Sequence, residues 1–195
     1  MRRALFLDRD GVINVDKGYV HRIDSFEWIP GIFDTARTAT GLGLALIVVT
    51  NQAGIARGYY SEAQFLALTD WMRKAFDDAG AALTDVYFCP EHPDGKPPYN
   101  LVSGRRKPAP GMLLQAAAEH GLDLASSALV GDQPSDIAAG LAAGLRHVAL
   151  FGSDASHPAN PSPTTALSDH AAACAWLQIV CGSGAPALTR QATPT

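Results

Sequence analysis

The stretch of sequence that decides the fold is Ala4-Leu5-Phe6-Leu7-Asp8-Arg9-Asp10-Gly11. Its first four residues form a short apolar run, as expected of a buried strand, and Asp8 ends that run abruptly. Carboxylates at positions i and i+2 of an extended chain emerge on the same side, so Asp8 and Asp10 can face one crevice. They repel each other unless a cation neutralises them or one binds a proton. The stretch therefore predicts a strand that ends in an acidic site, although Asp-Gly is also common in turns.

Further apolar runs and helical patterns alternate along the rest of the chain. Predicted strands cover 44–50, 85–88, 128–130 and 147–151, and predicted helices cover 31–40, 62–79, 110–120 and 134–143, with a closing helix over 169–180. This alternation predicts an α/β fold with a parallel sheet covered on both faces. Long loops over 11–30 and 89–106 suggest binding loops. We also expect a surface loop over 153–165 and a disordered tail over 182–195.

Composition restricts the class of protein. A chain of 195 residues with 47% hydrophobic and 17% charged residues fits one globular domain. The net charge of −4 and the absence of a long basic tract argue against a nucleic-acid partner. No apolar run is long enough for a membrane helix, and Asp8 interrupts the apolar start, so we expect a cytoplasmic protein without a signal peptide. Three widely spaced cysteines predict reduced thiols, and a monomer is the default expectation.

Three more polar residues stand at the ends of predicted strands or at the start of a helix. Thr50 ends the second strand, Asp132 follows the fourth, and Lys107 precedes the third helix. Ligands of open parallel sheets bind beyond the carboxyl ends of the strands, so these side chains are expected to converge on the crevice near Asp8. Each has an ordinary alternative as a helix cap, a surface lysine or a turn aspartate. Their joint order along the chain favours a common site.

This set of residues resembles the four motifs of the haloacid dehalogenase superfamily. Longer segments, 6–14, 18–21, 49–58 and 106–112, are similar to the heptose bisphosphate phosphatase family, with histidinol-phosphate phosphatases as relatives. The resemblance spans about residues 5–151. It implies a Rossmann-like three-layer sandwich with a central parallel sheet and no large cap domain, formed by residues 1–181 as one domain, with 89–106 as a loop near the substrate.

The resemblance also implies a magnesium-dependent phosphatase. Asp8 would attack phosphorus and form an aspartyl-phosphate. Asp10 would act as general acid and base. Mg²⁺ would be held by Asp8, the backbone carbonyl of Asp10 and Asp132, with Asp136 supporting the metal ligands from behind. Lys107 and Thr50 would stabilise the oxygens of the transferring phosphoryl group.

A second group of residues is expected to bind substrate because it corresponds to the family's recognition segments: Asp16, Lys17, Gly18, Tyr19, Asn51, Gln52, Ala53, Arg57, Arg106 and Gln133. The planar fork of Arg106 suits a second phosphate or sugar oxygens, although a solvated surface charge is an alternative. Gln133 departs from the family, which often has a lysine there, and this loss of charge is expected to affect affinity or anomeric preference.

Many family members bind a structural zinc ion in the loop before the motif lysine. In this chain Cys89 and His92 remain, but Ser103 and Arg105 occupy the positions of the second ligand pair. A structural zinc site needs four ligands, so we predict no zinc here. The prolines of the loop, at 90, 93, 97 and 98, are expected to stiffen it instead.

The leading functional prediction is removal of the 7-phosphate from D-glycero-D-manno-heptose 1,7-bisphosphate, on the route to nucleotide-activated heptose for a surface polysaccharide. A histidinol-phosphate phosphatase, or another small sugar phosphatase, is the alternative within enzymes. An inactive binding module with the same fold is a more remote alternative, because all five motif residues are present.

Overall fold

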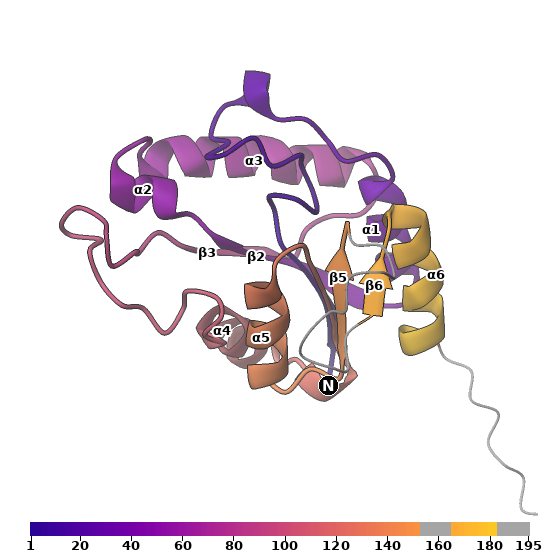
Figure 1. Ribbon diagram of the computed structural model, residues 1–195. Coiled ribbons are helices and arrows are strands. Elements are labelled where there is room, and N and C mark those ends of the chain that lie inside the picture. The colour runs from indigo at the N-terminus through magenta and orange to yellow at the C-terminus, as the bar shows by residue number, and fades with distance from the viewer. Residues whose placement is uncertain (153–164, 183–195) are drawn as a thin grey trace, which may run out of the picture.

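The computed structural model describes residues 1–152 and 165–182 (Figure 1). Its centre is a sheet of parallel strands in the order β3-β2-β1-β4-β5-β6. The strands are β1 (Arg3–Leu7), β2 (Leu44–Asn51), β3 (Asp85–Cys89), β4 (Ala128–Gly131), β5 (His147–Phe151) and β6 (Thr165–Leu167). The predicted parallel α/β sheet is confirmed.

The register of the central strands brings the predicted motif residues to one edge of the sheet. Leu7 of β1 pairs with Val48 of β2 on one side and with Val130 of β4 on the other. The residues that follow these positions therefore leave the sheet side by side. This is why motifs far apart in the sequence meet beyond the carboxyl ends of neighbouring strands.

Helices cover both faces of the sheet (Figure 1). On one face lie α1 (Ile32–Gly41), α3 (Glu62–Asp78) and α6 (His170–Cys181), and on the other lie α4 (Gly111–His120) and α5 (Pro134–Ala142). Side chains of β1 alternate between the faces: Leu5 and Leu7 pack in the first layer, Ala4 and Phe6 in the second. The result is the expected three-layer sandwich, and the described residues form no large cap domain.

The helix α3 shows how closely local signals set its boundaries. The Ser61 side chain accepts a hydrogen bond from the Gln64 backbone, and the Gln64 side chain accepts one from the Ser61 backbone, which is the predicted capping box. The buried face carries Phe65, Leu68, Met72 and Phe76 at the predicted spacing. The sequence prediction is confirmed for this helix, with its end one residue earlier than expected.

Four short elements were not predicted: α2 (Ala53–Arg57), the 3₁₀ turns η1 (Ile23–Ser25) and η2 (Leu124–Ser126), and β6. Each has three to five residues, too few to show a hydrophobic period. The expected surface loop is wrong at its last residue, because Thr165 begins β6. The rest of that prediction, and the predicted disorder from 183 onward, lie outside the described residues.

His170, the first residue of α6, fastens this helix to the segment after β1. Its Nε2 lies 2.9 Å from the Val12 carbonyl oxygen and its Nδ1 lies 2.9 Å from the Thr35 hydroxyl. Since a carbonyl only accepts, Nε2 carries the proton. Burial lowers the pKa of His170, which favours this neutral form. The contact supports the turn that carries Asp8 and Asp10 from behind.

The loop 89–106 packs against α2 and the end of β3. The Lys96 backbone N–H donates to the Ala56 carbonyl at 2.7 Å, and an Arg105 Nη2 donates to the Phe88 carbonyl at 3.0 Å. All three cysteines are free, as predicted. Within the described ranges, none of the helices has both the length and the apolar character needed to cross a bilayer.

Candidate active site

The core of the site is a buried contact between a lysine and two aspartates. The Lys107 Nζ lies 2.9 Å from Asp8 Oδ1 and 2.6 Å from Asp136 Oδ1, and it donates to the Val49 carbonyl at 2.8 Å. Asp8 Oδ1 also accepts from the backbone N–H of Arg9 at 2.7 Å. These contacts fix the carboxylate that follows β1 in one orientation.

A third carboxylate, Asp132, completes an acidic cluster with Asp8 and Asp136, in which one ligand atom from each lies within 4.8 Å of the others. The glycines beside this cluster are required by its geometry. A Cβ on Gly11 would lie 2.3 Å from Asp132 Oδ2, and a Cβ on Gly131 would lie 2.2 Å from the Asp136 Cβ. The chain therefore makes room for the carboxylates by having no side chain at these two positions.

Burial and neighbouring charges shift the pKa values of Asp8, Asp132 and Lys107. Burial raises the pKa of Asp8 to about 7, with Asp136 and Asp132 adding to the rise and Lys107 opposing it. Burial is also the largest cause of the raised pKa of Asp132. Burial alone would lower the pKa of Lys107, but Asp8 and Asp136 outweigh it and the pKa is raised. One cation thus faces three carboxylates, and the cluster has capacity for a further cation.

Asp10 lies beside this cluster and is held by several donors. Nε and Nη2 of the buried Arg9 donate to its two carboxylate oxygens, at 2.8–3.2 Å. The Asn14 amide donates to Asp10 Oδ1 at 2.9 Å and the Gln52 amide to Oδ2 at 3.1 Å. Asp10 keeps partial exposure, with 22% of its side chain accessible. It is therefore rigidly placed and still open to the cavity.

Thr50 and Asn51, at the end of β2, face the same edge. Thr50 Oγ1 accepts from the Gln52 amide at 2.8 Å. The Asn51 side chain pairs with the backbone of Lys107 in both directions, donating to its carbonyl and accepting from its N–H at 3.0 Å each. Asn51 thereby fixes the loop that carries the lysine.

These residues line one cavity of about 420 Å³. Of the predicted catalytic, metal and substrate residues, all but one line it: Asp8, Asp10, Asp16, Gly18, Tyr19, Thr50, Asn51, Gln52, Ala53, Arg57, Arg106, Lys107, Asp132, Gln133 and Asp136. The exception is Lys17, which forms a surface ion pair with Glu27 at 2.8 Å. The structure thus brings the predicted set together, while the role of each residue stays a prediction.

Three residues near the cavity were not predicted. Tyr60 and Ser135 line it, and Arg9 is buried beneath it with its guanidinium on Asp10. Arg9 stands between two aspartates in the sequence, and this neighbourhood could have suggested an ion pair with one of them. In an extended chain, however, side-chain alternation would place Arg9 on the face opposite to Asp8 and Asp10. The turn after β1 ends that alternation, because the Arg9 carbonyl accepts from the backbone N–H groups of Ile13 and Asn14.

The two remaining candidate zinc ligands each have protein partners. The buried Cys89 thiol donates to a Glu91 carboxylate oxygen at 3.1 Å, and burial, with Glu91 adding to it, raises its pKa to about 11. His92 Nδ1 accepts from the Asp94 backbone N–H at 3.1 Å. The predicted absence of zinc stays a prediction.

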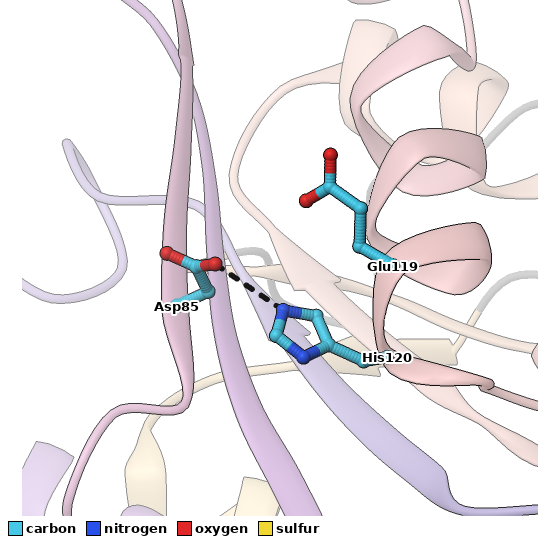
Figure 2. Close-up of side chains that lie close together, drawn as sticks. All are labelled: Asp85, Glu119 and His120. Carbon is cyan, nitrogen blue, oxygen red and sulfur yellow. Dashed lines mark hydrogen bonds and ion pairs between the residues drawn. The ribbon is translucent and has the colours of Figure 1, made fainter.

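A second group of possible metal ligands lies at the other end of β3, where Asp85 is the first residue of the strand (Figure 2). Asp85 lies 3.2 Å from His120 Nε2 and accepts from Arg73 at 2.8 Å. Glu119 accepts from the Tyr87 hydroxyl at 2.5 Å. Because protein donors already serve these oxygens, the group is a network of hydrogen bonds, with one ion pair between Arg73 and Asp85, that joins α3, β3 and α4 at the edge away from the cavity.

Comparison with known proteins agrees with this geometry. A family model described as HAD-hydrolase-like matches residues 104–171. A D-glycero-β-D-manno-heptose-1,7-bisphosphate 7-phosphatase from Yersinia pestis is 52% identical over 143 residues, 73% of this chain and 76% of the relative. The α-anomer counterpart from Burkholderia mallei is 56% identical over 144 residues, with the same coverage. The chain belongs to the heptose bisphosphate 7-phosphatase family. Its superfamily is therefore that of the haloacid dehalogenase-like hydrolases.

Solved structures extend the agreement with the family to the whole fold. The D,D-heptose 1,7-bisphosphate phosphatase of B. bronchiseptica, complexed with magnesium and phosphate, superposes with a TM-score of 0.79 at 30% identity, covering 91% of this chain and 98% of that one. A HAD-like phosphatase from Mesorhizobium loti gives a TM-score of 0.82 at 34% identity, covering 93% and 86%. The fold is thus shared with these phosphatases over more than nine tenths of the chain.

Proposed function

We propose that this chain hydrolyses the 7-phosphate of D-glycero-D-manno-heptose 1,7-bisphosphate in a magnesium-dependent reaction through Asp8. The observation that carries the proposal is the contact of Asp8 with Lys107 inside a cavity that also holds Asp10, Thr50 and Asp132. Membership of the heptose bisphosphate 7-phosphatase family supports the choice of substrate.

The reaction has two steps. In the first, an Asp8 carboxylate oxygen attacks phosphorus while the bond from phosphorus to the sugar oxygen breaks, and Asp10 gives its proton to the departing alkoxide. In the second, Asp10 takes a proton from water, whose oxygen attacks the aspartyl-phosphate and releases phosphate and free Asp8. Both residues line the same cavity, so one substrate phosphate can reach both.

The acidic cluster fits a magnesium ion. Asp132 Oδ1 is buried and has no hydrogen-bond partner among residues 1–152 and 165–182, so it is available as an oxygen ligand. Asp8, Asp132 and the backbone carbonyl of Asp10 would hold Mg²⁺, with Asp136 behind them. A bound Mg²⁺ neutralises charge on the phosphate and on the three carboxylates. It would also favour ionised Asp8, whose pKa of about 7 would otherwise leave much of it protonated at neutral pH.

Phosphate binding is assigned to the cations and donors around Asp8. Lys107 Nζ and the Thr50 hydroxyl face the transferring phosphoryl group, where charge stabilisation provides most of the catalysis. The cavity of about 420 Å³ is of the size expected for a small substrate. Arg57 and Arg106 line it and are the candidates for binding the second phosphate.

The test is phosphate release with Mg²⁺ present, from both anomers of the heptose bisphosphate and from histidinol phosphate. Fast turnover of one heptose anomer would support the proposal and identify the anomer. Fast turnover of histidinol phosphate alone would keep the mechanism and change the pathway. Asp8→Asn is expected to remove nearly all turnover without unfolding the chain, because it deletes the nucleophile and one of the crowded charges. Comparable activity in that variant would overturn the mechanism.

A further inference from the structure

A single buried amide connects two of the predicted catalytic side chains. Gln52 follows β2 and is 2% exposed. Its Nε2 donates to Thr50 Oγ1 at 2.8 Å and to Asp10 Oδ2 at 3.1 Å. The amide therefore bridges the segment after β1 and the end of β2. Any rotation of this amide would withdraw a donor from Thr50 and Asp10 together.

The orientation of the amide follows from its partners. Asp10 accepts hydrogen bonds from Arg9 and Asn14 as well, so Gln52 meets it with its NH₂ end as a further donor, and its carbonyl oxygen faces the other way. There Gln52 Oε1 accepts from the Tyr60 hydroxyl at 2.6 Å. The Tyr60 hydroxyl thus gives this buried oxygen its hydrogen-bond donor. Without that hydroxyl the oxygen would lose this bond, and leaving a buried acceptor unpaired costs free energy.

Tyr60 is itself held firmly in place. Its ring is stacked on that of His21, with centroids 4.8 Å apart and an interplanar angle of 7°. A Cβ on Gly54 would lie 2.1 Å from the ring, so α2 can approach Tyr60 only with glycine there. The ring also packs with Ile55 and Phe65 in a small apolar cluster. Burial raises the pKa of Tyr60 to about 12, so the hydroxyl keeps its proton at neutral pH.

We propose that Tyr60 is a positioning residue for the phosphatase reaction, acting through the Gln52 amide to hold Asp10 in its reactive orientation. This inference rests on the proposed function and deepens it. Tyr60 does not touch the reacting atoms in the proposed reaction. Its hydroxyl contributes by fixing which end of Gln52 faces Asp10, the group that protonates the leaving alkoxide.

The mechanism predicts for which substrates kcat/KM falls when the Tyr60 hydroxyl is removed. The ratio kcat/KM reports the first chemical step, in which Asp10 protonates the leaving group. An alcohol or phenol that leaves poorly needs that proton, whereas 4-nitrophenolate leaves well without it. Tyr60→Phe keeps the ring and its stacking but loses the hydroxyl. We expect kcat/KM to fall roughly tenfold or more for phenyl phosphate and for the sugar bisphosphate, and less than about threefold for 4-nitrophenyl phosphate, as for partial loss of general acid catalysis.

The experiment compares Tyr60→Phe, Gln52→Leu and the double variant with the unmodified chain, on both aryl phosphates with Mg²⁺. If Tyr60 acts through Gln52, adding Tyr60→Phe to Gln52→Leu causes no further loss. Tyr59→Phe is the matched control, because Tyr59 is exposed and packs on Tyr19. It is expected to leave the dependence on leaving group unchanged. Thermal unfolding of each variant checks the fold, and Gln52→Leu tests the same linkage should Tyr60→Phe not fold.

Several results would overturn the inference. Equal losses on both aryl phosphates, fully multiplicative effects in the double variant, or unchanged kinetics in Tyr60→Phe would each remove the role of Tyr60 while leaving the phosphatase intact. An unmodified chain without phosphatase activity on any of these substrates would overturn the proposed function and this inference together. The two failures are therefore distinguishable.

Discussion

Removing the buried cation of the site is predicted to destabilise the fold in a way that depends on pH. Lys107→Met keeps a long unbranched side chain but deletes the ammonium that contacts Asp8 and Asp136. At pH 8, in metal-free protein, these carboxylates would then lack their counter-charge, so the folded variant must either bury an unpaired charge or bind a proton at Asp8. Breaking a buried ion pair on one side costs about 3–5 kcal/mol. That is a large part of the roughly 5–15 kcal/mol that stabilises an ordinary domain.

The loss should shrink in mild acid, and the sign follows from the pKa of Asp8. Its folded pKa of about 7 lies above the ordinary value of 3.8, so protonation favours the folded state. This contribution is complete below about pH 4 and disappears as pH rises through about 7. Without Lys107 the folded pKa rises further. At pH 5.5 the Asp8 carboxyl is neutral with or without the lysine. Removing the ammonium at this pH therefore leaves fewer buried carboxylate charges without a counter-charge than it does at pH 8.

The assay is urea unfolding followed by tryptophan fluorescence, in EDTA, at pH 5.5 and 8. We expect the variant to lose about 3–5 kcal/mol at pH 8 and less than half of that at pH 5.5. The same measurement with Mg²⁺ at pH 8 should recover part of the loss. Lys74→Met is the matched control, because Lys74 forms an exposed pair with Asp78 and should change little at either pH. Equal losses of Lys107→Met at both pH values, or a loss below about 1 kcal/mol at pH 8, would refute the reasoning.

Three further predictions concern the metal site, the α6 contact and substrate recognition. Gly11→Ala should abolish Mg²⁺ binding measured by calorimetry, because the new Cβ would overlap Asp132. Gly18 also has a positive φ, but a Cβ there would meet open space, so Gly18→Ala should keep Mg²⁺ binding. Equal magnesium affinity in the two variants would contradict this prediction. His170 has a lowered pKa, so stability should fall as pH decreases below about 6.5, and this fall should be weaker in His170→Gln; parallel stability curves would contradict it. Arg106→Ala should reduce kcat/KM for the sugar bisphosphate roughly tenfold or more but only slightly for 4-nitrophenyl phosphate, and equal losses would remove its role in binding the second phosphate.

The sheet and the acidic site could be predicted because their signals are local and repeated. Each central strand is a short apolar run with a polar residue at its end or directly after it, and the parallel arrangement brings those ends together. Asp8, Thr50 and Asp132 therefore met as expected, and Lys107 joined them from the loop before α4. The resemblance to a known family supplied the chemical roles, which the pattern alone could not.

The contacts that orient the site could not be predicted, because they depend on how the loops turn. Arg9 appears in the sequence as a charge between two others, and only the turn after β1 places it in the interior against Asp10. Tyr60 follows a five-residue helix, α2, that has no detectable period. Its link to Asp10 passes through the Gln52 amide, and no sequence pattern encodes a hydrogen bond between two side chains across a turn.

The position of β1 between β2 and β4 has a consequence for synthesis on the ribosome. β1 and β2 are made early and can pair at once, but the other edge of β1 has no neighbour until β4 emerges. At about 5–20 residues per second, that edge would stay open for on the order of ten seconds. An apolar strand with an open edge invites pairing with other chains. The charged turn at Asp8, Arg9 and Asp10 lies directly after this strand, and the open edge of β1 can be covered only once residue 131 has left the exit tunnel.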